Sequence, residues 1–294
     1  MTVAERLRLR LPELTTAERK VARVLMASYP VGGLDPVAKL AAAAGVSAPT
    51  VVRLVAKLEF DGYAEFQQSL KAEVSARLSS PLEMHAEHPG AARGGALPRS
   101  EQLLCDGIRS SFAHLPAAEF DQAVTLLADG RRGVTLAGGR FSSMLAEYLA
   151  AHLRILRPRV QVLSAARPDR LSSMLDVGRR DVFVAFDYRR YQHDTIRLAT
   201  TAKDQGATLI AFTDPYLSPL AARADVILTS SVASPSPFDA LTPAMALVEA
   251  LIAALVDRLG DAPRARMARY DELNGGAVDD TRRPGAEPEG DDDG

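Results

Sequence analysis

Three arginines follow segments that read as buried strands. Arg189 and Arg190 come shortly after the apolar run 181–186, and Arg140 follows the apolar run 133–137. The carboxyl ends of parallel strands meet at one edge of a sheet, where open α/β sheets bind ligands. Arginine pairs with carboxylates and phosphates through two parallel hydrogen bonds. These residues predict a site for a small anion. The alternative is an arginine pair that forms ion pairs with acidic side chains at the surface or at an interface.

Serines and glycines in the same turns add to this prediction. Gly138 and Gly139 permit a tight turn, and a helix is expected to begin at the serine pair that follows. The N-terminus of a helix favours an anion through its free N–H groups and its dipole. Glycine-rich turns are also common for packing alone, and Asp-Pro and Ser-Pro pairs in the third turn initiate turns by themselves. The expected ligand-binding residues are Gly138, Arg140, Ser142, Ser143, Arg189, Arg190 and Ser218.

The first 60 residues contain a pattern typical of DNA-binding proteins. Thr15 and Glu18 form a capping box for one helix. Asp35 followed by proline begins a second helix, Gly45 ends it, and Ser47 can cap a third. A short helix, a turn of three to four residues and a second helix form a helix-turn-helix motif. The same spacing would also suit an ordinary helical hairpin.

The third helix of this motif has two faces. Apolar residues at helical spacing are expected to lie in the core: Val51, Leu54, Val55 and Leu58. An arginine on the other face can read guanine or pair with a phosphate, and a threonine can contact either. The residues expected to face DNA are Ser47, Ala48, Thr50, Arg53 and Lys57.

The composition of the chain limits the class of protein to which these sites can belong. The chain has 294 residues, of which 47% are hydrophobic, and one cysteine, Cys105, which suits a reducing cytosol. Arginines interrupt the N-terminus where a signal peptide needs an apolar core, so we expect a cytoplasmic protein. Residues 1–80 carry 11 Lys and Arg against 8 Asp and Glu, a mildly basic balance that is compatible with DNA.

The order of segments predicts two domains. Helix formers fill residues 1–79, a Gly- and Pro-rich stretch at 80–100 is expected to be a linker, and the acidic segment 271–294 is expected to be disordered from Asn274. Residues 101–270 alternate between β-branched runs and helical patterns, which predicts a doubly wound α/β domain with a parallel sheet. Strands are expected at 133–137, 160–163, 181–186, 207–212 and 225–229, and helices at 142–156, 193–205 and 239–259.

Residues 14–78 resemble the N-terminal domain of the RpiR family of bacterial transcription regulators. The resemblance is carried by LTTAERKVARVLM, LAAAAGVSAPTVVRLVAKL and GYAEFQQSLKAEV, and the run Gly45–Arg53 is its most specific part. It implies DNA binding. Glu59 stands where the family usually has glycine, and a non-glycine residue at positive φ costs about 1 kcal/mol, so we expect this turn to differ.

Residues 130–258 resemble the SIS (sugar isomerase) domain. Gly138, Ser142, the pair Asp181-Val182 and the run Ser218–Ala221 carry the resemblance. It implies a five-stranded parallel sheet and loops rich in Ser and Thr that recognise phosphosugars. The second loop departs from the usual Ser-x-Ser-Gly-x-Thr, and Arg140 replaces a glycine of the first loop. The positions of the second loop are occupied by Asp187, Arg189, Arg190 and Gln192.

Two classes of function remain. The first is a ligand-responsive regulator of transcription, with double-stranded DNA and a small anionic metabolite as partners. The second is a sugar-phosphate isomerase with an accessory helical domain, for which Glu147, His152 and His193 are the candidate proton-transfer groups. We favour the regulator without catalysis or a cofactor, since an isomerase has no need for residues 14–78. We also expect at least a homodimer, because one small helix-turn-helix module contacts too little DNA for a tight site.

Overall fold

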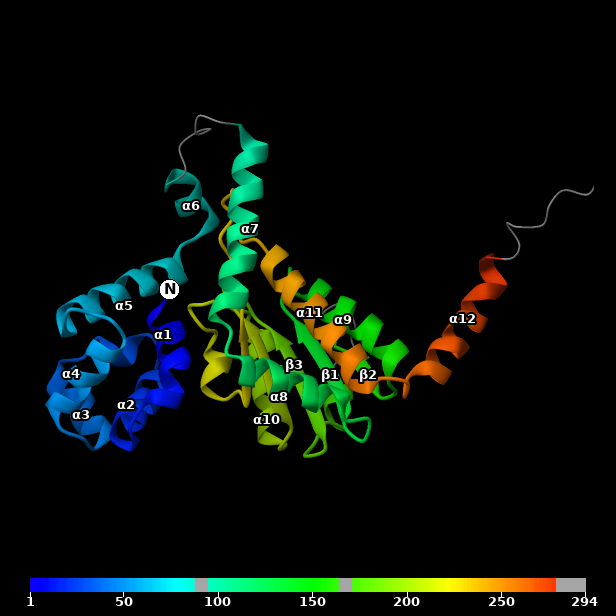
Figure 1. Cartoon of the computed structure of the whole chain (residues 1–294), viewed down its shortest axis with the longest axis horizontal. Helices are drawn as coiled ribbons and strands as arrows, with labels where there is room; N and C mark the ends of the chain where they lie inside the picture. Colours follow the sequence, from blue (N-terminus) through cyan, green and yellow to red (C-terminus); the bar gives the residue numbers. More distant parts are fainter. Residues whose placement is uncertain (88–94, 164–170, 279–294) are drawn as a thin grey trace, which may run out of the picture.

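The computed structural model describes residues 1–87, 95–163 and 171–278. A helical domain at the N-terminus packs beside an α/β domain (Figure 1). The helical domain comprises α1 (Val3–Arg10), α2 (Thr16–Ala27), α3 (Val37–Ala44), α4 (Ala48–Lys57) and α5 (Tyr63–Leu78).

Local signals set the ends of the helices in the first domain. Thr15 and Glu18 form the expected capping box at the start of α2, and Gly45 ends α3 at φ 60°. Helix α3 begins at Val37, one residue later than expected, because Pro36 occupies the N-cap. Helices α3 and α4 meet at 101°, within the range of helix-turn-helix motifs. The four apolar residues predicted to lie in the core are buried.

The turn after α4 keeps its left-handed backbone without a glycine. Glu59 has φ 64°, so the expectation of a different turn is wrong. Arg6 Nη1 donates hydrogen bonds to the backbone oxygens of Leu58, at 2.8 Å, and of Glu59, at 3.0 Å. The Glu59 carboxylate also pairs with Arg10. These contacts hold the strained residue in place.

The second domain contains the expected five-stranded parallel sheet. Its strands lie in the order β2-β1-β3-β4-β5. Each strand lies within one residue of its predicted position at either end. The strands are β1 (Gly133–Gly138), β2 (Val160–Val162), β3 (Asp181–Phe186), β4 (Thr208–Thr213) and β5 (Val226–Thr229).

Helices cover both faces of this sheet. One apolar core joins the sheet to α8 (Ala117–Ala128), α9 (Ser143–Leu156) and α11 (Thr242–Leu259). Another joins the opposite face to α10 (His193–Asp204). Helix α11 begins at Thr242 and not at Asp239, which lies in the preceding loop. This two-sided covering explains why the strands read as nearly continuous apolar runs.

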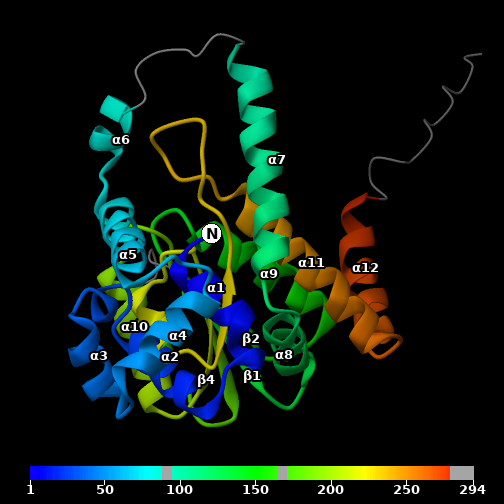
Figure 2. The same ribbon diagram turned by 60° about the vertical axis from the view of Figure 1, so that its left-hand side comes forward.

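Helix α1 joins the two domains by covering the free edge of β5 (Figure 2). The buried guanidinium of Arg8 donates to the backbone oxygen of Ile227 and lies 3.6 Å from Glu119. Glu119 in turn accepts a 2.8 Å hydrogen bond from the Ile227 N–H. A side chain that pairs with an edge strand prevents that strand from pairing with another chain. The two domains are therefore packed through specific polar contacts.

Two segments predicted to lack structure are partly helical. Helices α6 (Pro81–Glu87) and α7 (Ala96–His114) occupy parts of the expected linker. Ser80 and Glu83 form a capping box at the start of α6, a signal that the Gly- and Pro-rich composition obscured. Helix α12 (Arg264–Val278) extends past Asn274, so the tail is not disordered from that residue. Residues 88–94 and 279–294 lie outside the described residues.

No single helix among the described residues is long and apolar enough to cross a bilayer. Only α3 and α4 taken together reach the required length and apolarity, with the 101° bend between them.

Candidate functional site

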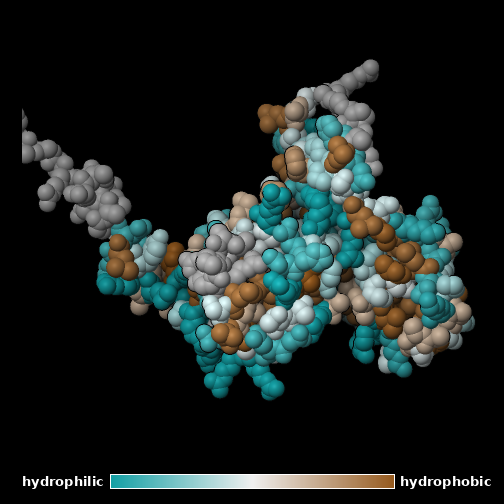
Figure 3. Space-filling model, turned by 180° about the vertical axis from the view of Figure 1, so that it is seen from behind, coloured by the Kyte–Doolittle hydropathy of each residue, from teal (hydrophilic) through white to brown (hydrophobic). Residues whose placement is uncertain are grey.

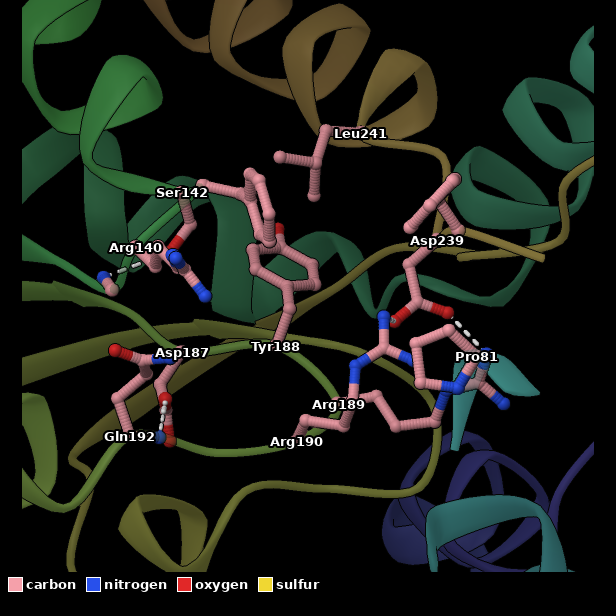
Figure 4. Close-up of a pocket in the computed structure, with 13 residues that line it drawn as sticks. Pro81, Arg140, Ser142, Asp187, Tyr188, Arg189, Arg190, Gln192, Asp239 and Leu241 are labelled. Carbon is pink, nitrogen blue, oxygen red and sulfur yellow. Dashed lines mark hydrogen bonds and ion pairs between the residues drawn. The ribbon is translucent and has the colours of Figure 1, made fainter. Parts of the chain in front are cut away.

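A cavity of about 680 Å³ opens at the carboxyl ends of β1 and β3 (Figure 4). The order of the strands reverses between these two strands, and sheets of this type bind ligands at that point. The loops after β1 and β3 supply most of the wall, and the loop before α11 and the start of α6 supply the rest. The lining residues are Pro81, Gly139, Arg140, Phe141, Ser142, Asp187, Tyr188, Arg189, Arg190, Gln192, Phe238, Asp239 and Leu241.

Gly138 makes the first loop possible. A Cβ atom at this residue would lie 2.6 Å from both the Cα and the backbone nitrogen of Ser143. Real Cβ atoms do not approach backbone so closely, so this position requires glycine for the tight turn into α9. Gly138 and Ser143 shape the loop and are not among the described lining residues.

Ser142 ties the first loop to the next strand. Its hydroxyl donates a 2.7 Å hydrogen bond to the backbone oxygen of Phe186 and accepts one of 2.9 Å from the Gly139 N–H. The side chain is buried. Ser142 therefore lines the cavity, but its hydroxyl proton is already used within the protein.

Arg189 and Arg190 share one carboxylate. Asp239 accepts from Arg189 through one oxygen and from Arg190, at 2.7 Å, through the other. Figure 4 shows this group on the opposite side of the cavity from Arg140. Asp239 and Arg189 are each less than one tenth exposed, whereas the Arg190 side chain is 31% exposed. The arginines are paired to an acidic side chain, as the second alternative has it, and they also line the cavity, so anion binding by them stays a prediction.

Arg189 also contacts the helical domain. Its Nη1 atom donates a 3.0 Å hydrogen bond to the backbone oxygen of Ala76 in α5, and its Nη2 atom lies 3.0 Å from the sulfur of Met84 in α6. The adjacent Tyr191 ring lies under the guanidinium of Arg77, 4.8 Å from its centre. The loop after β3 is therefore both a wall of the cavity and a contact with the other domain.

Asp187 is a buried carboxylate at the base of the second loop. It accepts hydrogen bonds from the backbone N–H of Gln192, at 3.0 Å, and from the hydroxyl of Ser218. Burial raises its pKa to about 6, against the lowering effect of these hydrogen bonds. Ser218 is thereby directed to Asp187 and is not part of the described lining.

Some of the lining residues missed from the sequence belong to the loop before α11. Asp239 and Phe238 were not assigned to the site, because this loop follows the last strand at a distance and matches no motif. Tyr188 and Phe141 lie next to predicted residues, and the apolar spacing gave no reason to distinguish them from core residues. The Tyr188 hydroxyl forms a 3.0 Å hydrogen bond with buried Ser230.

The exposed face of α4 differs from the predicted one at Thr50. This residue is 6% exposed, and its hydroxyl accepts a 3.0 Å hydrogen bond from Arg53 and contacts Ser47 Oγ at 3.0 Å. It therefore holds Arg53 and does not face solvent, because the side chain at this first turn packs inward. Ser47 and Arg53 are exposed, and Ala48 is half-buried.

Lys57 lies on the same face as Arg53 but is paired. Its ammonium group lies 2.7 Å from the buried carboxylate of Glu18 in α2. Burial raises the pKa of Glu18, but the hydrogen bonds from Lys57 and Thr15 outweigh it and lower that pKa overall. Figure 1 shows α3 and α4 at the outer end of the helical domain, away from the sheet.

Two family models match the chain. Residues 1–77 match the helix-turn-helix domain of the rpiR family, and residues 126–254 match the SIS domain. The chain belongs to the RpiR family of transcription regulators.

Curated relatives match about three quarters of the chain at modest identity. The transcriptional regulator HexR of Pseudomonas aeruginosa is 27% identical over 227 residues, which cover 76% of this chain and 77% of HexR. The bifunctional protein glk of Burkholderia mallei is 28% identical over 228 residues. The match covers 77% of this chain but only about a third (34%) of that longer relative.

Solved structures confirm the fold of this RpiR-family chain. The sugar isomerase domain of an RpiR transcription factor from Sphaerobacter thermophilus aligns with a TM-score of 0.56 and 21% identity, over 60% of this chain and 99% of that one. The Vibrio vulnificus NanR protein complexed with ManNAc-6P aligns with a TM-score of 0.53 and 18% identity, over 94% of this chain and 99% of NanR.

The proton-transfer candidates of this RpiR-family chain lie apart from the cavity. Glu147 and His193 are exposed on their helices. His152 uses Nδ1 for a 3.0 Å contact with the backbone oxygen of Tyr148, one turn earlier in α9. Within the described ranges, no cluster of three or more metal-ligating side chains occurs. The carboxylates that do line the cavity are those of Asp187 and Asp239.

Proposed function

We propose that this chain regulates transcription by binding double-stranded DNA with α4 and by sensing a small anionic metabolite, a phosphosugar or an organic acid, in the SIS cavity. The single observation that carries the proposal is the position of Arg189, which lines the cavity and contacts α5 of the DNA-binding domain. Ligand that engages this loop can thereby change the position or mobility of the helical domain.

The DNA-binding part of the proposal depends on Arg53. The side chain is exposed on α4 and is oriented by the hydroxyl of Thr50. An arginine held in one direction can form a bidentate pair with guanine, the commonest specific contact in the major groove. Ser47, at the start of the same helix, is exposed, and we expect it to approach the phosphate backbone.

The sensing part of the proposal depends on the net positive charge of the cavity wall. Three arginines and two aspartates are among the lining residues. NanR, which has the same fold, was solved with ManNAc-6P, and this supports a small anion as the ligand here. We assign no catalysis to the site, because Glu147, His152 and His193 lie outside its described lining.

We further propose a cytoplasmic homodimer or larger homo-oligomer. Regulators of this type read two half-sites with two subunits. Helix α7 projects from the body of the α/β domain (Figure 1), and Leu97 on it is 80% exposed. From behind, Figure 3 shows apolar surface on the projection that α6 and α7 form. A monomeric mass by light scattering at micromolar concentration would count against this part.

Sequencing of genomic fragments retained by the purified full chain tests the regulator. We expect a discrete set of fragments that share a two-fold symmetric sequence, with loss of this enrichment in Arg53→Ala. Arg131→Ala, a 92% exposed arginine at the other end of the sheet, is the matched control and should retain the same fragments. Equal retention of all fragments by all three proteins would contradict specific DNA binding.

A further inference from the structure

The hydroxyl groups closest to the cavity are already used by the protein. Ser142 donates to the backbone oxygen of Phe186, and Ser218 donates to Asp187. The Tyr188 hydroxyl shares a hydrogen bond with a buried serine. A phosphate group presents three strongly accepting oxygens and carries a charge of about −1.5 to −2. Ser142 and Ser218 can donate to it only by giving up their present acceptors.

The charge of the cavity wall matches a single negative charge. Asp239 neutralises one of the two arginines that it binds, and Asp187 offsets a second cation when it is ionised. One positive charge then remains in excess. The freest cation is Arg140, which is exposed and lies 5.8 Å from the centre of the Phe141 ring. Asp187 would repel a phosphate dianion more strongly than a carboxylate monoanion.

Apolar side chains form the remaining wall. Phe141 and Phe238 are 66% and 61% exposed, and Leu241 and Pro81 complete this side of the cavity. Exposed aromatic side chains beside a concave site favour a ligand that covers them with apolar surface.

We infer that the ligand is a carboxylate with an apolar body and not a phosphosugar. The carboxylate pairs with Arg140, and the apolar body lies between Phe141 and Phe238. This inference rests on the proposed function, because it names the class of ligand for the same cavity.

Calorimetry on the purified full chain at pH 7.5 tests the inference. The carboxylate probes are phenylacetate, benzoate and hexanoate, and the phosphate probes are glucose 6-phosphate, ManNAc-6P and inorganic phosphate. We expect at least one carboxylate to bind ten-fold or more tightly than every phosphate probe. Equal or tighter binding of a phosphosugar, or no binding of any carboxylate probe, overturns the inference.

Three variants test the residue assignments. Arg140→Ala should weaken the best carboxylate at least ten-fold, and Phe238→Ala should weaken it at least five-fold. Asp187→Asn removes the repulsion and should strengthen glucose 6-phosphate at least five-fold with a smaller effect on the carboxylate. Arg131→Ala should leave every affinity unchanged. Unchanged carboxylate affinity in both Arg140→Ala and Phe238→Ala overturns the placement.

DNA binding, measured on the same samples, separates the two proposals. If the chain binds no specific DNA but prefers the carboxylate, the proposed function fails and the ligand class stands. If the chain binds specific DNA and only a phosphosugar changes that binding, the ligand class fails and the proposed function stands.

Discussion

Arg189 links the ligand cavity to the helical domain, since its Nη1 atom lies 3.0 Å from the backbone oxygen of Ala76 near the end of α5. The same guanidinium pairs with Asp239 on the cavity wall. A ligand whose apolar body reaches Phe238 can displace the neighbouring Asp239, and any movement of Arg189 that follows would change its contact with α5. A ligand changes DNA affinity only through such a difference between two states.

Arg189→Ala should separate ligand binding from the DNA response. Arg190→Ala is the matched variant, because Arg190 binds the same carboxylate but forms no hydrogen bond or ion pair with α5 among the described residues. Both variants should weaken the ligand. At saturating ligand, Arg190→Ala should still show the full change in operator affinity, which is typically five- to 150-fold for coupled sites. The logarithm of this change should fall to less than half of its wild-type value in Arg189→Ala. A full response in Arg189→Ala, measured by fluorescence anisotropy, would rule out this route.

Glu73 should make stability depend on pH. It is buried, accepts a 2.8 Å hydrogen bond from the Val3 N–H and another from the Tyr29 hydroxyl, and burial raises its pKa to about 7. The nearby Glu5 carboxylate also raises this pKa. Because the folded pKa is above the unfolded value of 4.5, the folded state binds more protons between these pH values. Stability is therefore lost as pH rises through this window.

Comparison of Glu73→Gln with the wild type tests this pH dependence of stability, because the variant has no titrating group at this position. Denaturant unfolding of both proteins at pH 4.5 to 8 should show the wild type losing up to about 3 kcal/mol relative to the variant as pH rises. The comparison cancels the other carboxylates, which titrate in both proteins. Parallel curves across the whole range would mean that Glu73 does not titrate in this window.

The sequence predicted the framework of the fold better than the detail of the site. Strand and helix positions follow from local periodicity, and the capping box at Thr15 and the glycine at position 45 act within one turn. The role of Ser142 depends on the backbone oxygen of Phe186, 44 residues away. The partner of the two arginines, Asp239, lies about 50 residues further along the chain. Such pairings are set by tertiary packing, which no local pattern encodes.

Thr50 illustrates the same limit on the DNA-binding helix. Helical spacing places it on the exposed face, yet it is buried against the first turn and accepts from Arg53. A periodic pattern predicts the direction in which each side chain points. It does not predict how deeply the first turn of the helix is buried against its neighbours. The pattern was accurate for Arg53, one turn further along.

Glu59→Gly should stabilise the protein. Glycine removes the strain of a non-glycine residue at φ 64°, worth about 1 kcal/mol, and loses only an exposed ion pair with Arg10 that is worth little. Glu59→Ala keeps the strain and loses the ion pair, so it should be neutral or slightly destabilising. Thermal melts of the three proteins should rank glycine first. A lower melting temperature for Glu59→Gly than for Glu59→Ala would mean that the backbone is not strained there.

Arg53 should contribute to operator recognition directly, and Thr50 should contribute by positioning it. Arg53→Ala should cost about 1–3 kcal/mol in operator binding if the guanidinium reads a base, with little change in affinity for unrelated DNA. If it contacts a phosphate instead, the loss should be uniform across sequences and the salt slope should fall by about one. Lys57→Ala leaves the buried Glu18 carboxylate without its partner, so its effect on DNA binding must be read with a thermal melt.

Thr50→Val keeps the shape of the side chain and removes the hydroxyl that orients Arg53. It should weaken specific binding by less than Arg53→Ala does. In the Arg53→Ala background it should have no further effect, because a positioning residue acts only through the residue that it holds. Anisotropy titrations of the four proteins on one operator give this cycle. Additive losses would show that Thr50 acts on DNA by another route, and wild-type affinity in both Arg53→Ala and Lys57→Ala would show that α4 is not the recognition helix.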